Sequence, residues 1–139
     1  MSYDREREIQ EAIRAGERAL DSLHDAERML GSAGNWGLVD MFGGNTISGL
    51  MKHKKINDAS RCLSDAKADL RAFSRELDDV RGLDDLNINV GDFLTFADFF
   101  FDGFVADFLV QSKIGDAKRQ VKEAIRRVED TLRKLRRAV

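Results

Sequence analysis

The chain of 139 residues has no proline, one cysteine, one tryptophan, one tyrosine and two histidines. The absence of proline argues against immunoglobulin-like sandwiches and proline-punctuated loops, and it favours long uninterrupted helices. A single cysteine excludes an internal disulfide framework and a cysteine-based zinc site, and two histidines leave little for a histidine-rich metal site. We therefore expect a single helical domain of 15.7 kDa in a reducing compartment.

The net charge of −2 conceals a strong segregation of charge along the chain. Residues 83–112 contain six aspartates and no lysine or arginine, whereas residues 113–139 contain ten basic and four acidic side chains. Residues 1–30 are acidic, with five basic and eight acidic side chains. We expect the basic C-terminal helix to pair laterally with this acidic first helix rather than to bind nucleic acid.

No transmembrane segment is expected. The most apolar stretch, residues 93–110, contains Asp98, Asp102 and Asp107. Each aspartate would cost roughly 2.5–3.5 kcal/mol at the centre of a bilayer. The first ten residues are almost wholly polar where a signal peptide would be apolar, so a cytoplasmic location is expected.

Three segments repeat apolar or small residues at the alternating spacing of four and three that is typical of heptad helices. A second apolar stripe runs beside the third seam, which favours a bundle over a two-stranded coiled coil. The predicted seams are Ile9, Ile13, Gly16, Leu20, Leu23 and Leu30; Ile56, Ala59, Leu63, Ala66, Leu70, Phe73, Leu77 and Val80; and Ile114, Ala117, Val121, Ala124, Val128, Thr131, Leu135 and Ala138.

The predicted fold is all-α: an up-down-up, antiparallel coiled-coil bundle of three long helices joined by two short apolar elbow helices. The predicted helices cover residues 3–31, 46–82 and 104–139, and the elbows cover residues 32–45 and 83–103. A homodimer is the expected assembly.

Glycine, asparagine and aspartate residues mark the predicted ends of these elements. Gly31 follows the last residue of the first seam, where glycine commonly ends a helix. Asn45 is the candidate N-cap of the second helix, and Asp92 that of the short helix in the second elbow.

A shift of 58 positions aligns the two elbow-plus-helix units without a gap. Asp40 then meets Asp98, and Phe42 meets Phe100. The run from Lys55 to Arg61 also shares its lysine, isoleucine, aspartate, alanine and arginine with the run that begins at Lys113. The sequence therefore predicts an internal repeat of 58 residues.

The second elbow and the helix start after it contain seven of the nine phenylalanines. Three slender helices cannot bury all of them, and a large exposed apolar patch marks an interface or a membrane-contacting surface. Three interpretations stay open: a local core at the end of the bundle, self-association, and contact with a membrane or another partner. The candidate interaction residues are Trp36, Phe42, Phe93, Phe96, Phe99, Phe100, Phe101, Phe104 and Phe108.

Asp40 and Asp98 are the repeated carboxylates in apolar surroundings, and the favoured interpretation is that they cap helices rather than serve as acids or metal ligands. His24 and His53 lack metal-ligand spacing, and Cys62 has no histidine nearby that would make it a nucleophile. No phosphate-binding glycine motif is present. No catalytic, metal-binding or cofactor-binding residue is assigned.

Several strings of the sequence resemble a group of uncharacterised bacterial helical proteins. They are Asn35-Trp36-Gly37 with Asp40, Gly43 and Gly44; Lys52-His53-Lys54-Lys55-Ile56; Phe96-Ala97-Asp98-Phe99-Phe100-Phe101-Asp102-Gly103; and Val110-Gln111-Ser112-Lys113-Ile114. The resemblance covers residues 30–120. It implies a bacterial, helical protein and brings no activity or catalytic residue with it.

The functional expectation is a non-enzymatic interaction or scaffold protein that binds a second copy or another helical protein through its apolar elbows and heptad faces. The alternative is a peripheral membrane protein that uses the phenylalanine-rich elbow. A third hypothesis is an enzyme that uses a metal ion at Asp40 and Asp98.

Overall fold

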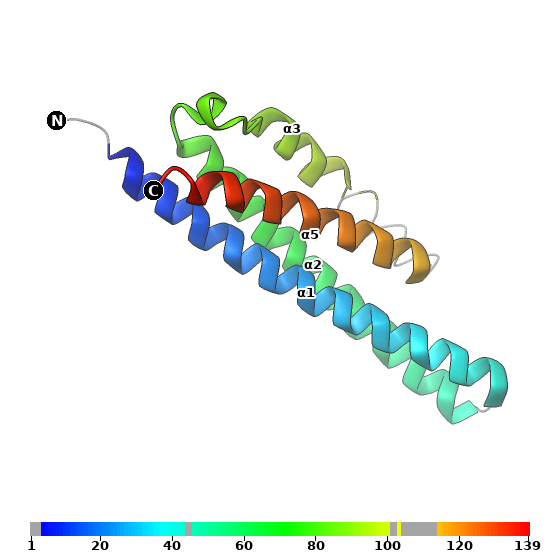
Figure 1. Ribbon diagram of the computed structural model, residues 1–139. Helices are drawn as coiled ribbons and strands as arrows, with labels where there is room; N and C mark the ends of the chain where they lie inside the picture. The colour runs from blue at the N-terminus through cyan, green and yellow to red at the C-terminus, as the bar shows by residue number, and fades with distance from the viewer. Residues whose placement is uncertain (1–3, 44–45, 101–102, 104–113) are drawn as a thin grey trace.

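The structure is a computed structural model that describes residues 4–43, 46–100, 103 and 114–139 (Figure 1). Side chains are described for residues 4–31, 57–83, 85–98, 103 and 115–139. Throughout these ranges the chain forms helices joined by turns, and no strand occurs in them. The expectation of an all-α protein is confirmed.

Two long helices form an antiparallel hairpin. Helix α1 covers Arg5–Gly43 and helix α2 covers Thr46–Asp79. Near the middle of the hairpin, the Ser22 hydroxyl donates a hydrogen bond to the Asp69 carboxylate. At its N-terminal end, the guanidinium of Arg5 donates to the carbonyl oxygens of Arg81 and Gly82 at 3.0 and 3.1 Å. These contacts set the register of the two helices along their length.

Helix α1 does not end at Gly31, where the sequence predicted its end. The backbone stays helical to Gly43, so residues 32–43 continue α1 instead of forming a separate elbow helix. A glycine inside a helix costs only about 1 kcal/mol, and there is no proline here to break the hydrogen-bond ladder. The predicted N-cap Asn45 lies outside the described residues.

The segment after α2 reverses direction and returns along that helix. It contains the short 3-10 helix η1 (Leu83–Leu86), helix α3 (Val90–Thr95) and the π-helical turn η2 (Phe96–Phe100). Gly82 and Asn87 have φ angles of 73° and 58° in the reversal. The N-cap of α3 is Asn89, not Asp92: the Asn89 side chain accepts a hydrogen bond from the backbone N–H of Asp92 at 3.0 Å.

Helix α5 (Ile114–Arg136) runs antiparallel to α1, so the predicted three-helix, up-down-up topology is wrong (Figure 1). Near its C-terminal end, Arg136 lies 3.6 Å from Glu17 of α1, and Lys134 donates to the Asn87 carbonyl at 2.9 Å. The physical reason is that the second connector forms a packed helical leg of its own, α3 with η2. With four legs instead of three, α5 points in the same direction as α2.

The core follows the predicted second and third seams, from Ala59 to Val80 and from Ala117 to Leu135, whose members are buried. On α1 the seam differs from the prediction, because alanines take the place of Ile13 and Leu20. Those two side chains are only partly buried at the edge of the core. Small alanines let the helices approach closely, which leaves the larger side chains at the periphery. The buried alanines are Ala12, Ala15, Ala19 and Ala26.

The predicted 58-residue repeat relates the α1–α2 turn to the connection between η2 and α5. Most of the second connection, residues 101–102 and 104–113, lies outside the described residues. The repeat therefore stays a prediction.

Candidate functional site

Two of the predicted interaction residues, Phe93 and Phe96, belong to the core of a single chain. Their side chains are 6% and 8% exposed. Phe93 packs edge-on against Phe73 of α2, with ring centroids 5.2 Å apart, and against Phe96 at 6.0 Å. Aromatic pairs of this geometry stabilise a core beyond the area they bury. For these two residues the local-core interpretation holds, because the α3–η2 leg provides a fourth packing surface.

Arg127 of α5 covers the ring of Phe96. Its guanidinium carbon lies 4.7 Å from the ring centroid, within the range of a cation–π contact. Phe93 and Phe96 therefore hold α2, α3 and α5 together and are closed to a partner. The side chains of Phe99 and Phe100, and residues Phe101, Phe104 and Phe108, lie outside the described part of the chain.

The carboxylates Asp40 and Asp98 do not share a site. Asp98 lies in η2, with its carboxylate 4.0 Å from Arg71 of α2 and no described contact with backbone N–H groups at a helix start. Asp40 lies near the far end of α1, and its side chain is outside the described set. The Ser22–Asp69 contact sets the hairpin register, which places Asp40 beside α2 about twenty residues before Arg71, or roughly 30 Å along the helix. One metal ion cannot bind both.

Beyond the start of α5, α1 and α2 continue as a two-helix projection that we call the distal arm (residues 32–43 and 46–56; Figure 1). Trp36 and Phe42 lie on its α1 half, and only the backbone of the arm is described. The twelve residues of that half include one charged residue, Asp40. At 100° per residue, its large apolar residues cover an arc of about 220° of the helix, and Asp40 lies in the remaining sector. They are Trp36, Leu38, Val39, Met41 and Phe42.

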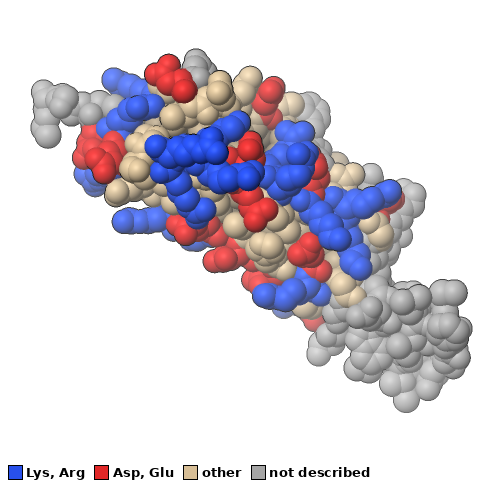
Figure 2. Space-filling model, viewed as in Figure 1, with Lys and Arg blue, Asp and Glu red and all other residues tan. Residues whose placement is uncertain are grey.

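Among the described residues, most ion pairs of α5 lie within the helix, and the predicted pairing with α1 is limited to one ion pair. Arg126 and Arg127 donate to Glu123, and these hydrogen bonds, chiefly that from Arg126, lower the pKa of the Glu123 carboxyl. Among the described residues, the ion pair that joins α5 to α1 is Arg136 with Glu17 at 3.6 Å. Figure 2 shows basic side chains gathered on the face of the molecule that α5 forms.

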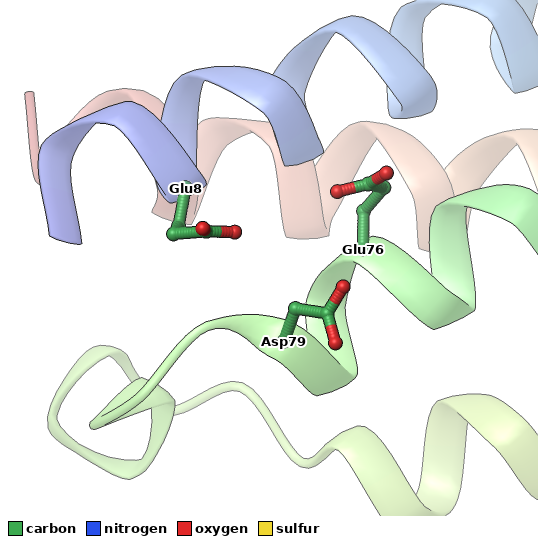
Figure 3. Close-up of side chains that lie close together, drawn as sticks. All are labelled: Glu8, Glu76 and Asp79. Carbon is green, nitrogen blue, oxygen red and sulfur yellow. The ribbon is translucent and has the colours of Figure 1, made fainter. Parts of the chain in front are cut away.

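Glu8 of α1 meets Glu76 and Asp79 of α2 near the N-terminal end of the hairpin, and sequence reasoning missed this cluster (Figure 3). One carboxylate oxygen of each lies within 4.8 Å of the others. Burial, followed by the charges of Glu11, Asp79 and Glu8, raises the pKa of the Glu76 carboxyl. The sequence places Glu76 and Asp79 on one helix face, but only the hairpin register adds Glu8. All three stay partly exposed, an arrangement that is common without a metal.

Cys62 packs partly buried against the core, as predicted for a small hydrophobic side chain. Burial is the main cause that raises the pKa of the Cys62 thiol, and the negative charges of Asp25, Asp65 and Asp58 raise it further. A raised pKa keeps the thiol protonated and weakly nucleophilic.

No helix in the described part of the chain is long and apolar enough to cross a membrane. Comparison of the chain with protein-family models, with curated proteins and with solved structures finds no match. The assignment of a function therefore depends on the surfaces described above.

Proposed function

We propose that this protein is a non-enzymatic helical interaction protein that associates with a second copy of itself through the distal arm. The observation that carries the proposal is the combination of two features of the arm. Two helices form it in the described structure, and the large apolar residues of its α1 half cover an arc of about 220°.

A helix in a two-helix hairpin can bury only the side that faces its partner. The large apolar residues of 32–43 cover an arc of about 220°, which is wider than the stripe of roughly 100° that a helix needs to pack against one neighbour. An apolar arc of this width is typical of a helix that has neighbours on more than one side. A second arm related by a two-fold axis would supply two more helices and complete a four-helix bundle.

The proposed interaction surface lies in the first predicted elbow, residues 32–45, rather than in the second, residues 83–103. Phe93 and Phe96 are buried within one chain, so Trp36 and Phe42 are the predicted interaction residues that support it best. The peripheral-membrane alternative depends on the same phenylalanine-rich segment and loses the same two side chains. Three other predictions from the sequence are kept: a bacterial origin, a cytoplasmic location and the 58-residue repeat.

The test is sedimentation velocity of the full chain across nanomolar to high micromolar concentrations. Trp36 is the single tryptophan, so its fluorescence reports on the arm directly. We expect dimers at micromolar concentration and a shift of the emission to shorter wavelength as they form. The double variant Phe42→Ser with Val39→Ser should stay monomeric.

Val139→Ser is the matched control. Val139 is a large hydrophobic residue at the C-terminus, outside the distal arm, and it is 51% exposed. It should dimerise like the parent protein. A parent protein that stays monomeric at high micromolar concentration, or a double variant that dimerises as well as the parent, would contradict the proposal.

A further inference from the structure

The outward side of α5 carries a concentrated row of positive charge, which we call the cationic ridge. At 100° per residue, seven basic side chains and one acidic side chain, Glu129, fall within roughly a 100° arc of the helix. All but one of the seven are exposed; Lys118 is half-buried. The seven are Lys118, Arg119, Lys122, Arg126, Arg133, Arg136 and Arg137.

The positive charge of the ridge is only partly neutralised. Asp116, Glu123 and Asp130 form ion pairs three residues along the helix, but they lie on the flank that faces α3. On the flank that faces α1, Glu17 pairs with Arg136. Lys118, Lys122 and Arg137 form no ion pair with any described residue, and Figure 2 shows the resulting basic face. Among the residues whose side chains are described, these three cations have no acidic partner, so their charge can attract an anionic surface.

The shape and composition of the ridge determine which polyanion suits it. The ridge is straight and spans about 29 Å from Lys118 to Arg137 at 1.5 Å per residue. A flat surface can contact it along its whole length, whereas the phosphate strands of a duplex wind around the duplex axis and do not follow a straight row. No aromatic residue follows Phe108, so the ridge has no ring on which an unpaired base could stack.

We propose that the cationic ridge of α5 is a docking surface for the anionic face of an acidic phospholipid bilayer. Lipid phosphates and carboxylates would accept hydrogen bonds from its arginine and lysine side chains. The apolar side chains of α5, from Ala117 to Leu135, are in the core, so the helix does not insert. Binding through charge alone is reversible and strongly dependent on salt.

The rest of the chain favours this orientation. Outside residues 113–139, the sequence contains thirteen basic and twenty-one acidic side chains. The acidic excess lies in residues 1–30 and 83–112, which an anionic surface repels, whereas residues 46–56 contain three lysines and no acid. The ridge therefore faces the bilayer. This inference does not depend on self-association through the arm.

The test is sedimentation of the full chain with vesicles of phosphatidylcholine alone or mixed with phosphatidylserine. We expect binding to the mixed vesicles, loss of that binding in high salt, and none to phosphatidylcholine alone. The variant Lys118→Gln, Lys122→Gln, Arg137→Gln should bind on the order of a hundredfold more weakly, at about fivefold for each cation near the surface. Circular dichroism verifies that it is folded.

The matched control removes the same number of cations from α1 and α2: Arg7→Gln, Arg28→Gln and Arg61→Gln, whose ion pairs lie within their own helices. It should bind like the parent protein. The inference is overturned by no binding to the mixed vesicles, by equal binding to neutral vesicles, or by equal losses in the two triple variants. Tighter ridge-dependent binding of duplex DNA or RNA at the same salt concentration also overturns it, in favour of a nucleic acid.

Discussion

Gly16 offers the sharpest test of how the helices pack, because three helices meet at this residue. A Cβ added to Gly16 of α1 would lie 2.7 Å from the Leu132 Cδ2 atom of α5 and 2.9 Å from the ring of Phe73 on α2. Carbon atoms in favourable contact lie about 3.5–4.0 Å apart. Leu132 and Phe73 are fully buried, and Phe73 is held edge-on by Phe93, so neither can move away cheaply.

Gly16→Ala is therefore expected to destabilise the protein, although alanine is the better helix former. Overpacking of a core costs about 1–3 kcal/mol, and replacing glycine in a helix gains about 0.5–1 kcal/mol. The expected net loss is therefore up to about 2.5 kcal/mol. Urea unfolding followed by circular dichroism measures it, with the slope of the transition unchanged.

Gly31→Ala is the matched control on the same helix, because a Cβ there meets no described atom within 4 Å. It should stabilise the protein by about 0.5–1 kcal/mol. In a double-mutant cycle, Leu132→Ala should cost about 1 kcal/mol less in the Gly16→Ala background than in the parent. If Gly16→Ala stabilises the chain as much as Gly31→Ala does, the three helices do not converge at Gly16 and the packing argument is refuted.

Two further predictions concern the core and the acidic cluster. Phe93→Ala should destabilise the chain by about 3–5 kcal/mol, as measured by the urea midpoint, and Phe93→Leu should destabilise it by less. If Phe93→Ala is as stable as the parent protein, Phe93 is not part of the core. For Glu76, a pKa raised in the folded state means that its negative charge disfavours folding above that pKa. Stability from this group should therefore increase as the pH falls through the folded pKa, and Glu76→Gln should stabilise the chain at neutral pH by up to about 0.5 kcal/mol. That gain should vanish by about pH 4, and a gain of the same size at both pH values would show that charge is not its cause.

Much of the core of α2 and α5 could be predicted from the sequence. The seams from Ala59 to Val80 and from Ala117 to Leu135 are buried because helical spacing alone places their residues on one face. On α1 the same spacing allows two series, one through Ile13 and Leu20 and the other through Ala12 and Ala19. Which of them faces the core depends on how closely the neighbouring helices approach.

The candidate surfaces, too, could be predicted only in part from the sequence. The excess of cations in residues 113–139 is a property of the sequence, but the partners of those cations are not. The sequence predicted that the acidic α1 pairs with them, and the structure gives this contact one described ion pair, Arg136 with Glu17. Most of the other described ion pairs of α5 are formed within the helix, and Lys134 and Arg127 also contact Asn87 and Phe96. The acidic cluster at Glu8 arose only when the hairpin register brought two helices together.

The sequence by itself determined that this protein is helical, that it has no internal disulfide, and that it is divided into charged helical segments and apolar connectors. Tertiary structure decided that α1 passes through Gly31, that the second connector packs as a fourth leg, and that α5 runs antiparallel to α1. The physical reason is that helix periodicity is a local property, read from residues three and four apart. The end of a helix at a glycine and the path of a connector depend instead on whether distant helices offer apolar surface to bury, as Phe73 does for Phe93.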